Sequence, residues 1–387
     1  MAVPKLRFKE FDADYTNTTF EKLKGFSIQS GKSEEKGDTG EFPFYGSTGV
    51  IGYKDIFDYE GKSILIARVG ANAGSLYQID GKYSVSDNTL RLTVSDDTSL
   101  DYLRELLIKF NLNRLVFGTG QPLVTGGMIK KVNIFIPEFT EQTKIASFLS
   151  NVDEKISQLT QKHALLSQYK QGMMQKLFSQ QIRFKADDGS EFGEWGKAKV
   201  GNITETIFGY PFDSKEMVED NNGIPLMRGI NIGECHIRHS FELDRFFLKD
   251  TSKLEKYFVR VNDIVLSMDG SKVGRNSAFV TEKDAGSLLV QRVCILREKE
   301  NTNIQYVYQW IISKEFHRYV DQVKTSSGIP HISGKQIQDY EISYPCLEEQ
   351  TKIASFLSSI DQKIEVVAQQ IEQAKTWKKG LLQQMFI

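Results

Sequence analysis

The sequence predicts an α+β fold. Two β-rich globular segments alternate with two long helices, and the helices pair as an antiparallel coiled coil in a pseudo-two-fold internal repeat. The main observation is that the ten residues EQTKIASFLS begin at Glu141 and begin again at Glu349, 208 positions further along. At that offset, without a gap, 18 of the 39 residues in 140–178 are identical to their counterparts. The chain is therefore built as two related halves.

Composition is that of an ordinary globular protein. The 387 residues suffice for two or three domains, and 40% hydrophobic with 26% charged residues is typical of such domains. No window resembles a membrane span or a signal peptide. Cys235, Cys294 and Cys346 are few and far apart, which favours a reducing cytoplasm over a disulfide framework. A formal net charge of −1 argues against strong nucleic-acid binding by the chain alone.

Residues 1–139 form the first expected domain. Glycine, aromatic and β-branched residues occur there in short runs separated by turns. SILIARVGANAGSLYQI, from Ser63, is typical of a strand, a glycine-bearing loop and a second strand. KLRF opens this domain at Lys5, and GTGQPLVTG closes it at residues 118–126.

Residues 140–181 form the expected central helix. A strand-like run, VNIFIP, precedes it, and no proline occurs from residue 138 to residue 210. Apolar residues recur at spacings of four and three, which indicates a heptad seam over more than four heptads. The seam that we expect at the helix pair comprises Ile145, Leu149, Val152, Ile156, Ile353, Leu357, Ile360 and Ile364. A seam this narrow favours pairing with the other helix over packing on the helix's own domain alone. Gly172 and Gly380 would permit either close approach of another chain or a kink.

Residues 182–345 form the second expected domain, and residues 346–387 the C-terminal helix. QIRF opens this half at Gln181, and SSGIPHISG at residues 326–334 closes the domain. DIVLSMDGSKVGRNSAFV, from Asp263, again indicates strand, loop and strand. Elsewhere the two domains resemble each other only faintly. The repeating unit is thus a globular domain whose sequence differs between the two halves, followed by a helix whose sequence pattern is the same in both.

This order of units resembles the DNA-specificity subunits of Type I restriction-modification enzymes, over essentially the whole chain. PEFTEQTKIASFLSNVDEKI and PCLEEQTKIASFLSSIDQKI are similar to the start of the family's conserved helices. FPFYGSTGVIGY, at residues 42–53, resembles a common opening of its target-recognition domains. The second domain departs there, with IPLMRGINIGE from Ile224, which implies a different loop and a different target.

The resemblance implies a non-catalytic subunit that recognises a bipartite, asymmetric target on double-stranded DNA, without a membrane association. Two modification subunits would bind S-adenosylmethionine and methylate adenine N6. Two restriction subunits would use ATP and Mg to translocate and cleave DNA. This chain itself would hold no cofactor.

Two other classes of function fit the sequence less well. A self-contained methyltransferase or nuclease is disfavoured because the chain has no Pro-Pro, no phosphate-binding GxxxxGK[ST] loop and no Pro-Asp. A scaffold that organises partners without DNA is disfavoured by the unlike, glycine-rich loops. The only metal-like cluster is CHIRH, with Cys235, His236 and His239, and we expect no metal there because no second cluster lies nearby. We expect His163, on the seam, to be a polar residue that fixes the helix register.

Base recognition needs side chains that make paired hydrogen bonds in the major groove. The loops offer such residues in both domains, and we expect about a third of them to contact DNA. Candidates in the first domain are Tyr45, Ser47, Thr48, Arg68, Asn72, Asn88, Arg91 and Gln121. Candidates in the second are Arg228, Asn231, Lys272, Arg275, Gln291, Arg292, Ser327, His331 and Lys335. Residues 118–122 and 327–330 recur in both halves and are expected to shape a loop or touch phosphate.

Overall fold

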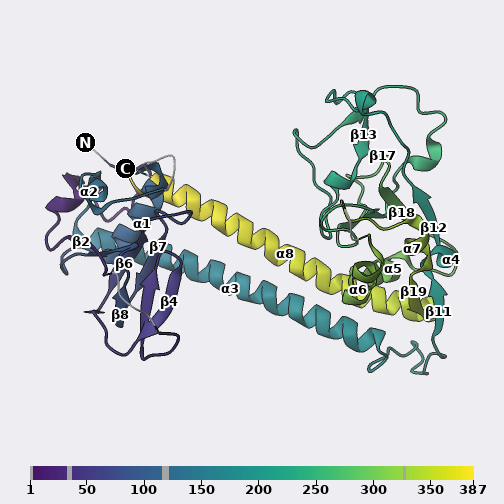
Figure 1. The fold of residues 1–387 in the computed structure, drawn as a ribbon, viewed down its shortest axis with the longest axis horizontal. Helices are drawn as coiled ribbons and strands as arrows, with labels where there is room; N and C mark the ends of the chain where they lie inside the picture. Colours follow the sequence, from purple (N-terminus) through teal and green to yellow (C-terminus); the bar gives the residue numbers. More distant parts are fainter. Residues whose placement is uncertain (1–2, 33–36, 116–121, 326–327) are drawn as a thin grey trace. The chain divides into compact units, whose positions relative to one another are not determined.

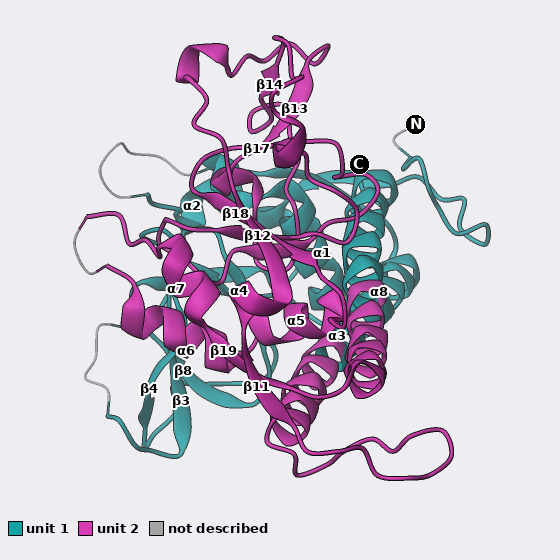
Figure 2. Ribbon diagram, turned by 90° about the vertical axis from the view of Figure 1, so that its right-hand side faces the viewer, with its two compact units in different colours: residues 1–162, 367–387 teal, residues 163–366 magenta. Residues whose placement is uncertain are grey.

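The computed structural model describes residues 3–32, 37–115, 122–325 and 328–387 (Figure 1). The chain divides into two compact units, coloured separately in Figure 2. Unit 1 comprises residues 1–162 and 367–387, and unit 2 comprises residues 163–366. Each unit therefore contains one β-rich globule together with one part of each long helix. No helix of the described residues is long and apolar enough to cross a membrane.

Unit 1 is built on three sheets. A two-stranded sheet joins the start and the end of the globule, with β1 (Thr16–Thr19) antiparallel to β10 (Asn133–Ile136). The four-stranded central sheet has the order β2 (Ser27–Ser30), β9 (Thr89–Thr93), β6 (Ser63–Ala67), β7 (Leu76–Ile79). The third sheet has the order β4 (Gly49–Lys54), β3 (Phe42–Gly46), β8 (Lys82–Val85), β5 (Tyr59–Glu60). Two helices pack beside them, α1 (Leu100–Phe110) and α2 (Gly126–Lys130).

Unit 2 repeats this plan. Its two-stranded sheet is β11 (Gly196–Lys199) with β19 (Glu341–Tyr344). The four-stranded sheet has the order β12 (Thr204–Phe208), β18 (Val293–Glu298), β15 (Ile264–Ser267), β16 (Ser277–Phe279). The third sheet has the order β14 (Phe246–Phe247), β13 (Ile224–Met227), β17 (Leu288–Leu289). Its helices are α4 (Val200–Ile203), α5 (Ile304–Ile311), α6 (Lys314–Val323) and α7 (Gly334–Asp339).

The two globules share a topology that their sequences barely reveal. In both, the central sheet is antiparallel throughout, and the third sheet contains one parallel pair, β3 with β8 and β13 with β17. The two strand–loop–strand motifs are confirmed as β6–β7 and β15–β16. The predicted α+β internal repeat is therefore confirmed, and it extends to the strand order of the central sheet, whereas the third sheet has four strands in unit 1 and three in unit 2.

The long helices are α3 (Phe139–Phe178) and α8 (Leu347–Met385), and they pair as predicted (Figure 1). Two ion pairs fix an antiparallel register. In unit 1, Lys378 Nζ lies 2.7 Å from both carboxylate oxygens of Asp153. In unit 2, Lys170 Nζ lies 2.6 Å from Asp361 Oδ1. Asp153 and Lys170 are the counterparts of Asp361 and Lys378 in the repeat, so the same pair is used once in each unit.

The seam residues also pack on the globules, which the periodicity alone did not indicate. Ile145, Leu149 and Val152 are buried in the core of unit 1, together with strands β6 and β9 and helix α1. The end of α8 contributes Leu381, Leu382 and Met385 to the same core, and Phe386, directly after the helix, joins them. Ile353, Leu357 and Ile360 are buried in the equivalent core of unit 2, with Leu177 and Phe178 from the end of α3. Ile156 and Ile364 are partly buried. Each seam thus belongs to a globular core as well as to the helix pair.

The identical ten-residue segments have an identical structural task. Glu141 is fully buried and accepts two hydrogen bonds from Arg7, at 2.8 and 2.7 Å, and one from the Tyr15 hydroxyl at 3.0 Å. Glu349 is equally buried and accepts two from Arg183, at 3.1 and 2.7 Å, and one from Trp195 Nε1 at 2.8 Å. These hydrogen bonds raise the pKa of both arginines. Each carboxylate therefore ties the first residues of a half to the helix that ends its globule.

The glutamine that follows each glutamate caps the junction. Gln142 donates to the Pro137 carbonyl (2.9 Å) and accepts from the Ser99 amide (2.9 Å), at the start of α1. Gln350 donates to the Pro345 carbonyl (2.8 Å) and accepts from the Asn303 amide (2.9 Å), at the start of α5. Backbone groups that would otherwise be buried without partners are thereby satisfied.

Replacing Glu349 by alanine tests this junction. The substitution leaves the Arg183 guanidinium and the Trp195 indole without their acceptor, and unpairing a buried charge is costly. We expect urea-induced unfolding, followed by circular dichroism, to show unit 2 destabilised by about 2–4 kcal/mol. The control is Glu191→Ala, which removes an exposed ion pair with Lys185 and should leave the unfolding curve unchanged. Equal effects of the two substitutions would contradict the role given to Glu349.

Candidate nucleic-acid interface

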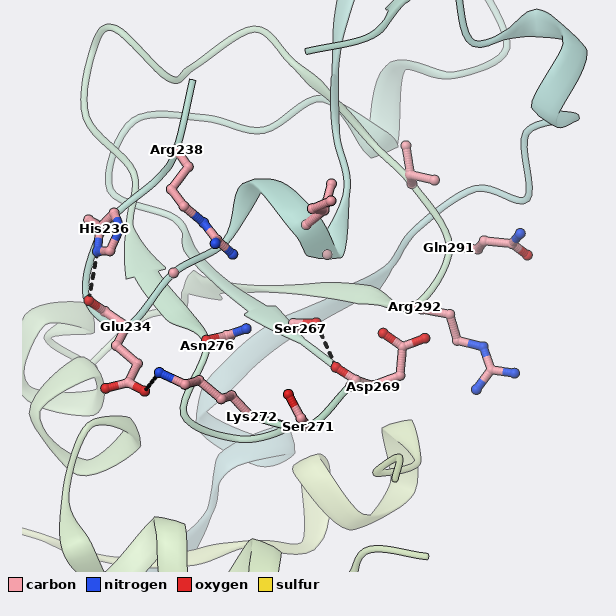
Figure 3. Close-up of a pocket in the computed structure, with 15 residues that line it drawn as sticks. Glu234, His236, Arg238, Ser267, Asp269, Ser271, Lys272, Asn276, Gln291 and Arg292 are labelled. Carbon is pink, nitrogen blue, oxygen red and sulfur yellow. Dashed lines mark hydrogen bonds and ion pairs between the residues drawn. The ribbon is translucent and has the colours of Figure 1, made fainter. Parts of the chain in front are cut away.

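A polar cleft of about 800 Å³ opens in unit 2 at the end of strand β15 (Figure 3). Three segments line it: the 3-10 turn Gly229–Asn231 with the residues after it, the β15–β16 loop, and the turn between β17 and β18. The residues with polar side chains are Glu234, His236, Arg238, Ser267, Asp269, Ser271, Lys272, Asn276, Gln291 and Arg292. Loop residues carried on rigid strands are a common arrangement for a binding site.

Backbone hydrogen bonds hold the loops of the cleft together. The Met268 amide donates to the Arg292 carbonyl (2.8 Å), and the Gly270 amide donates to the Pro330 carbonyl (3.0 Å). Gly270 has φ +100° and a Cβ there would meet open space, so the backbone conformation rather than crowding requires glycine. The segment around Pro330 therefore helps to hold the β15–β16 loop in place.

The charges of the cleft are mixed. Lys272 Nζ lies 2.7 Å from Glu234 Oε1, and this hydrogen bond lowers the pKa of Glu234. Arg238 Nη2 donates to the Ile232 carbonyl (2.9 Å). Asp269 and Arg292, in contrast, have no hydrogen-bond or ion-pair partner for their charged groups among the described residues. The cleft thus offers both an unpaired acceptor and an unpaired donor.

Of the residues proposed from the sequence for the second domain, Lys272, Gln291 and Arg292 line the cleft. His331 lies beside it, because it pairs with Asp269 in an isolated bridge; its Nδ1 lies 2.9 Å from the Thr325 hydroxyl. Ser327 lies outside the described residues.

Four other candidates of the second domain bind groups within unit 2, three of them in its framework and one, Lys335, on the exposed surface. Asn231 is 2% exposed and donates to the Arg238 carbonyl and to Asp244. Burial lowers the pKa of Arg228, whose Nη2 donates to the Leu243 carbonyl. Arg275 makes two hydrogen bonds to Asp321 and holds the pKa of that carboxyl well below its usual range. Lys335 pairs with Asp339 at 3.0 Å.

Unit 1 has the equivalent loops. The Arg68 amide donates to the Asn88 carbonyl (2.9 Å), and the Gly70 amide donates to the Pro122 carbonyl (3.1 Å). Asn72 and Asn88 are exposed on these loops, and Thr48 is exposed on the β3–β4 turn beside half-buried Ser47. The structure therefore places most of the first-domain candidates on the same strand ends that carry the cleft in unit 2.

Three first-domain candidates remain. Arg91 donates to the Tyr83 hydroxyl (2.8 Å) and lies over the ring of Tyr59. Tyr45 packs edge-on against Tyr83, and burial raises its pKa. Both side chains are engaged within unit 1. Gln121 lies outside the described residues.

The CHIRH residues do not converge. His236 Nδ1 lies 2.9 Å from the Glu234 carbonyl, whereas His239 Nε2 lies 2.9 Å from Asp284. Cys235 is a free, exposed cysteine. Within the described part of the chain, no group of three or more His, Cys, Asp or Glu side chains could hold a metal ion.

Sequence reasoning missed Glu234, Arg238, Asp269 and Asn276 as lining residues. Asp269 was detectable in principle, because the β15–β16 loop containing it aligns with the β6–β7 loop of unit 1. A base edge can be recognised by a carboxylate as well as by a cation.

Comparison with known proteins agrees with this architecture. The protein-family model of the Type I restriction modification DNA specificity domain matches residues 19–168 and 194–376 of this chain. The chain is 28% identical over 333 residues to the Type I restriction enzyme MjaVIII specificity subunit of Methanocaldococcus jannaschii, covering 82% of this chain and 77% of that relative. It is 21% identical over 334 residues to the putative type I specificity subunit S.MpnORF507P of Mycoplasma pneumoniae, covering 84% and 83%.

A solved structure shares the fold. The crystal structure of a Type-I restriction-modification system S subunit from M. genitalium aligns with a TM-score of 0.67 and 17% sequence identity, over 100% of this chain and 99% of that one. Because the family match spans both halves of the repeat, the chain belongs to the Type I restriction modification DNA specificity family, and it is a specificity subunit that recognises a DNA target without being catalytic itself.

Proposed function

We propose that this subunit reads a bipartite, asymmetric target on double-stranded DNA and directs adenine methylation or cleavage by partner subunits to it. The observation that carries the proposal is the internal repeat. The strand order of the central sheet and the loop anchoring are the same in the two units, but the loop tips differ, with Asn72 and Asn88 in unit 1 and Lys272 and Arg292 in unit 2. Two unlike reading modules on one chain support two unlike half-sites.

The proposed organisation has target-recognition domains at residues 1–139 and 182–345 and conserved helices at residues 140–181 and 346–387. Within the domains, we assign base reading to exposed side chains on the loop tips and a framework role to those held inside a unit. Arg275 and Asn231 belong to the second group, because each is already hydrogen-bonded within unit 2.

We assign the chemistry to partners. Two modification subunits would bind S-adenosylmethionine and methylate adenine N6, and two restriction subunits would use ATP and Mg. The net charge of −1 supports this division of labour. Neutralising DNA phosphates supplies much of the affinity of DNA-binding proteins, and a nearly neutral chain needs partners to supply it.

The exposed apolar residues of the helices are the proposed docking surface for modification subunits. Leu165 is 65% exposed and Tyr169 52% exposed on α3, and Val366 is 52% exposed on α8, all within unit 2. Large apolar side chains clustered on an exposed face are typical of a protein-binding surface.

Binding measurements test the division of labour. The chain alone should bind target DNA weakly at physiological salt, and added modification subunit should tighten binding at least about tenfold with selectivity for the target. Replacing Leu165 and Tyr169 by serine should reduce that gain. Phe241→Ser, which removes an apolar side chain that is 81% exposed but not on the helices, is the control and should retain it. Tight, sequence-specific binding by the chain alone would contradict the proposal.

Helix length is the proposed determinant of the gap between half-sites. The two ion pairs place the centre of the helix pairing at Gln161 and Gln369, which are counterparts in the repeat. Inserting four residues after each would lengthen both helices by about 6 Å and about one turn, which keeps the seam nearly in phase. We expect sequencing of methylated DNA to show a gap longer by one or two base pairs, since base pairs rise about 3.4 Å.

The control for this prediction is a four-residue insertion in the exposed turn at Gly189. It lies outside the helices and should leave the gap unchanged. An active double-insertion variant that keeps the original gap, or that changes a half-site instead, would show that the helices do not set the spacing.

A further inference from the structure

Two charged residues line the cleft of unit 2 from different loops without forming an ion pair with each other. Asp269 follows strand β15, and Arg292 lies in the turn that leads into β18; both line the cleft (Figure 3). No ion pair joins them within 4.0 Å, and the described residues offer neither charged group another partner. Six other arginines of unit 2 donate side-chain hydrogen bonds to groups within the unit. They are Arg183 (to Glu349), Arg228 (to Leu243), Arg238 (to Ile232), Arg245 (to Asp244), Arg275 (to Asp321) and Arg297 (to Asp263).

The backbone at Arg292 is unusual for this residue type. Its φ is +68°, at the third position of a turn closed by the Val293 amide on the Val290 carbonyl (3.2 Å). Glycine or asparagine adopts this left-handed conformation more easily than arginine does. Strained positions of this kind cluster at functional sites, and Arg292 lies in a turn that lines the cleft.

We propose that Asp269 and Arg292 together read the major-groove edge of one G·C base pair; this assignment rests on the proposed function. Arginine binds guanine O6 and N7 with paired hydrogen bonds, and a carboxylate accepts from cytosine N4. A phosphate contact fits less well, because Asp269 would repel the phosphate that Arg292 attracts. An unpaired acceptor and an unpaired donor on one cleft match the two bases of a G·C pair.

The repeat supplies a matched comparison. In unit 1, Val69 occupies the position of Asp269 and Asn88 that of Arg292. The correspondence follows from one backbone hydrogen bond in each unit: the Arg68 amide donates to the Asn88 carbonyl, and the Met268 amide donates to the Arg292 carbonyl. Val69 forms an isolated bridge with Leu123, as Asp269 does with His331. Asparagine suits adenine and an apolar side chain suits the thymine methyl group, so this pair would not select G·C. The turns before β9 and β18 differ in one respect: Arg292 has a positive φ, whereas Asn88 does not.

The test uses the full chain assembled with its modification subunit. Sequencing of methylated DNA from a host with both subunits gives the wild-type target. Arg292→Asn, which suits the left-handed backbone, and Arg292→Ala should each lose the preference for G·C at one position of one half-site. The discrimination lost should be roughly 5- to 150-fold. Asp269→Val should weaken the preference at the same position. Arg275→Ala, whose guanidinium is held by Asp321, is the control and should leave the target unchanged.

Three outcomes would overturn the assignment. They are an unchanged target in the Arg292 variants, uniform weakening on all sequences, and relaxation of different positions by the Arg292 and Asp269 substitutions. Failure of the wild-type complex to methylate any gapped target would instead refute the proposed function. The two failures are therefore distinguishable.

A second measurement changes the DNA rather than the protein and compares the wild-type complex with the Arg292→Ala complex. Binding of the wild-type complex is compared on target duplexes in which single guanines are replaced by 7-deazaguanine, which lacks the N7 acceptor. One guanine of one half-site should show a loss of several-fold or more, and the same replacement should cause no further loss in the Arg292→Ala complex. Equal sensitivity of the two complexes at every guanine would refute the contact.

Discussion

The fold depends on two buried carboxylates, Glu141 and Glu349. Each binds an arginine from the first residues of its half and a polar aromatic side chain, and each stands where a globule ends and a long helix begins. Such a carboxylate is tolerated only with full hydrogen bonding, so the arginine and the helix start are mutually required. Both ends of each globule are thereby fixed at one point. The loops between those ends are free to vary without loosening the junction.

The same constraint separates the residues that recur in the two halves of the chain from the residues that differ between them. Residues that serve the junction and the helix pairing recur, as Asp153 with Lys378 and Lys170 with Asp361. Neighbours of these ion pairs already diverge: Lys378 also binds buried Glu105, whereas Asp361 also accepts from Gln309. Divergence is greatest at the loop tips, which carry Asn72 and Asn88 in unit 1 but Lys272 and Arg292 in unit 2. A specificity subunit needs this distribution, because a new target requires new loop tips on an unchanged frame.

Sequence alone predicted the helices, the repeat and the strand–loop–strand motifs, because these depend on local periodicity and on turn residues. It did not predict that Leu149 and Leu357 pack on the globules as well as at the helix pair, since those partners lie far away in the chain. Asn231 was a plausible base reader by residue type, but the Arg238 carbonyl and Asp244 bind its amide inside the domain. Asp269 was missed because only the fold shows that it lines the same cleft as Arg292.

Exchange of one recognition domain tests the central claim, that two separable reading modules share one helical frame. The measurement is sequencing of methylated DNA from a host that carries the modification subunit and a chain whose residues 182–345 come from a relative. The account expects a gapped target with one half-site replaced, and with the other half-site and the gap unchanged. A target in which both half-sites change, or one that is continuous, would contradict it.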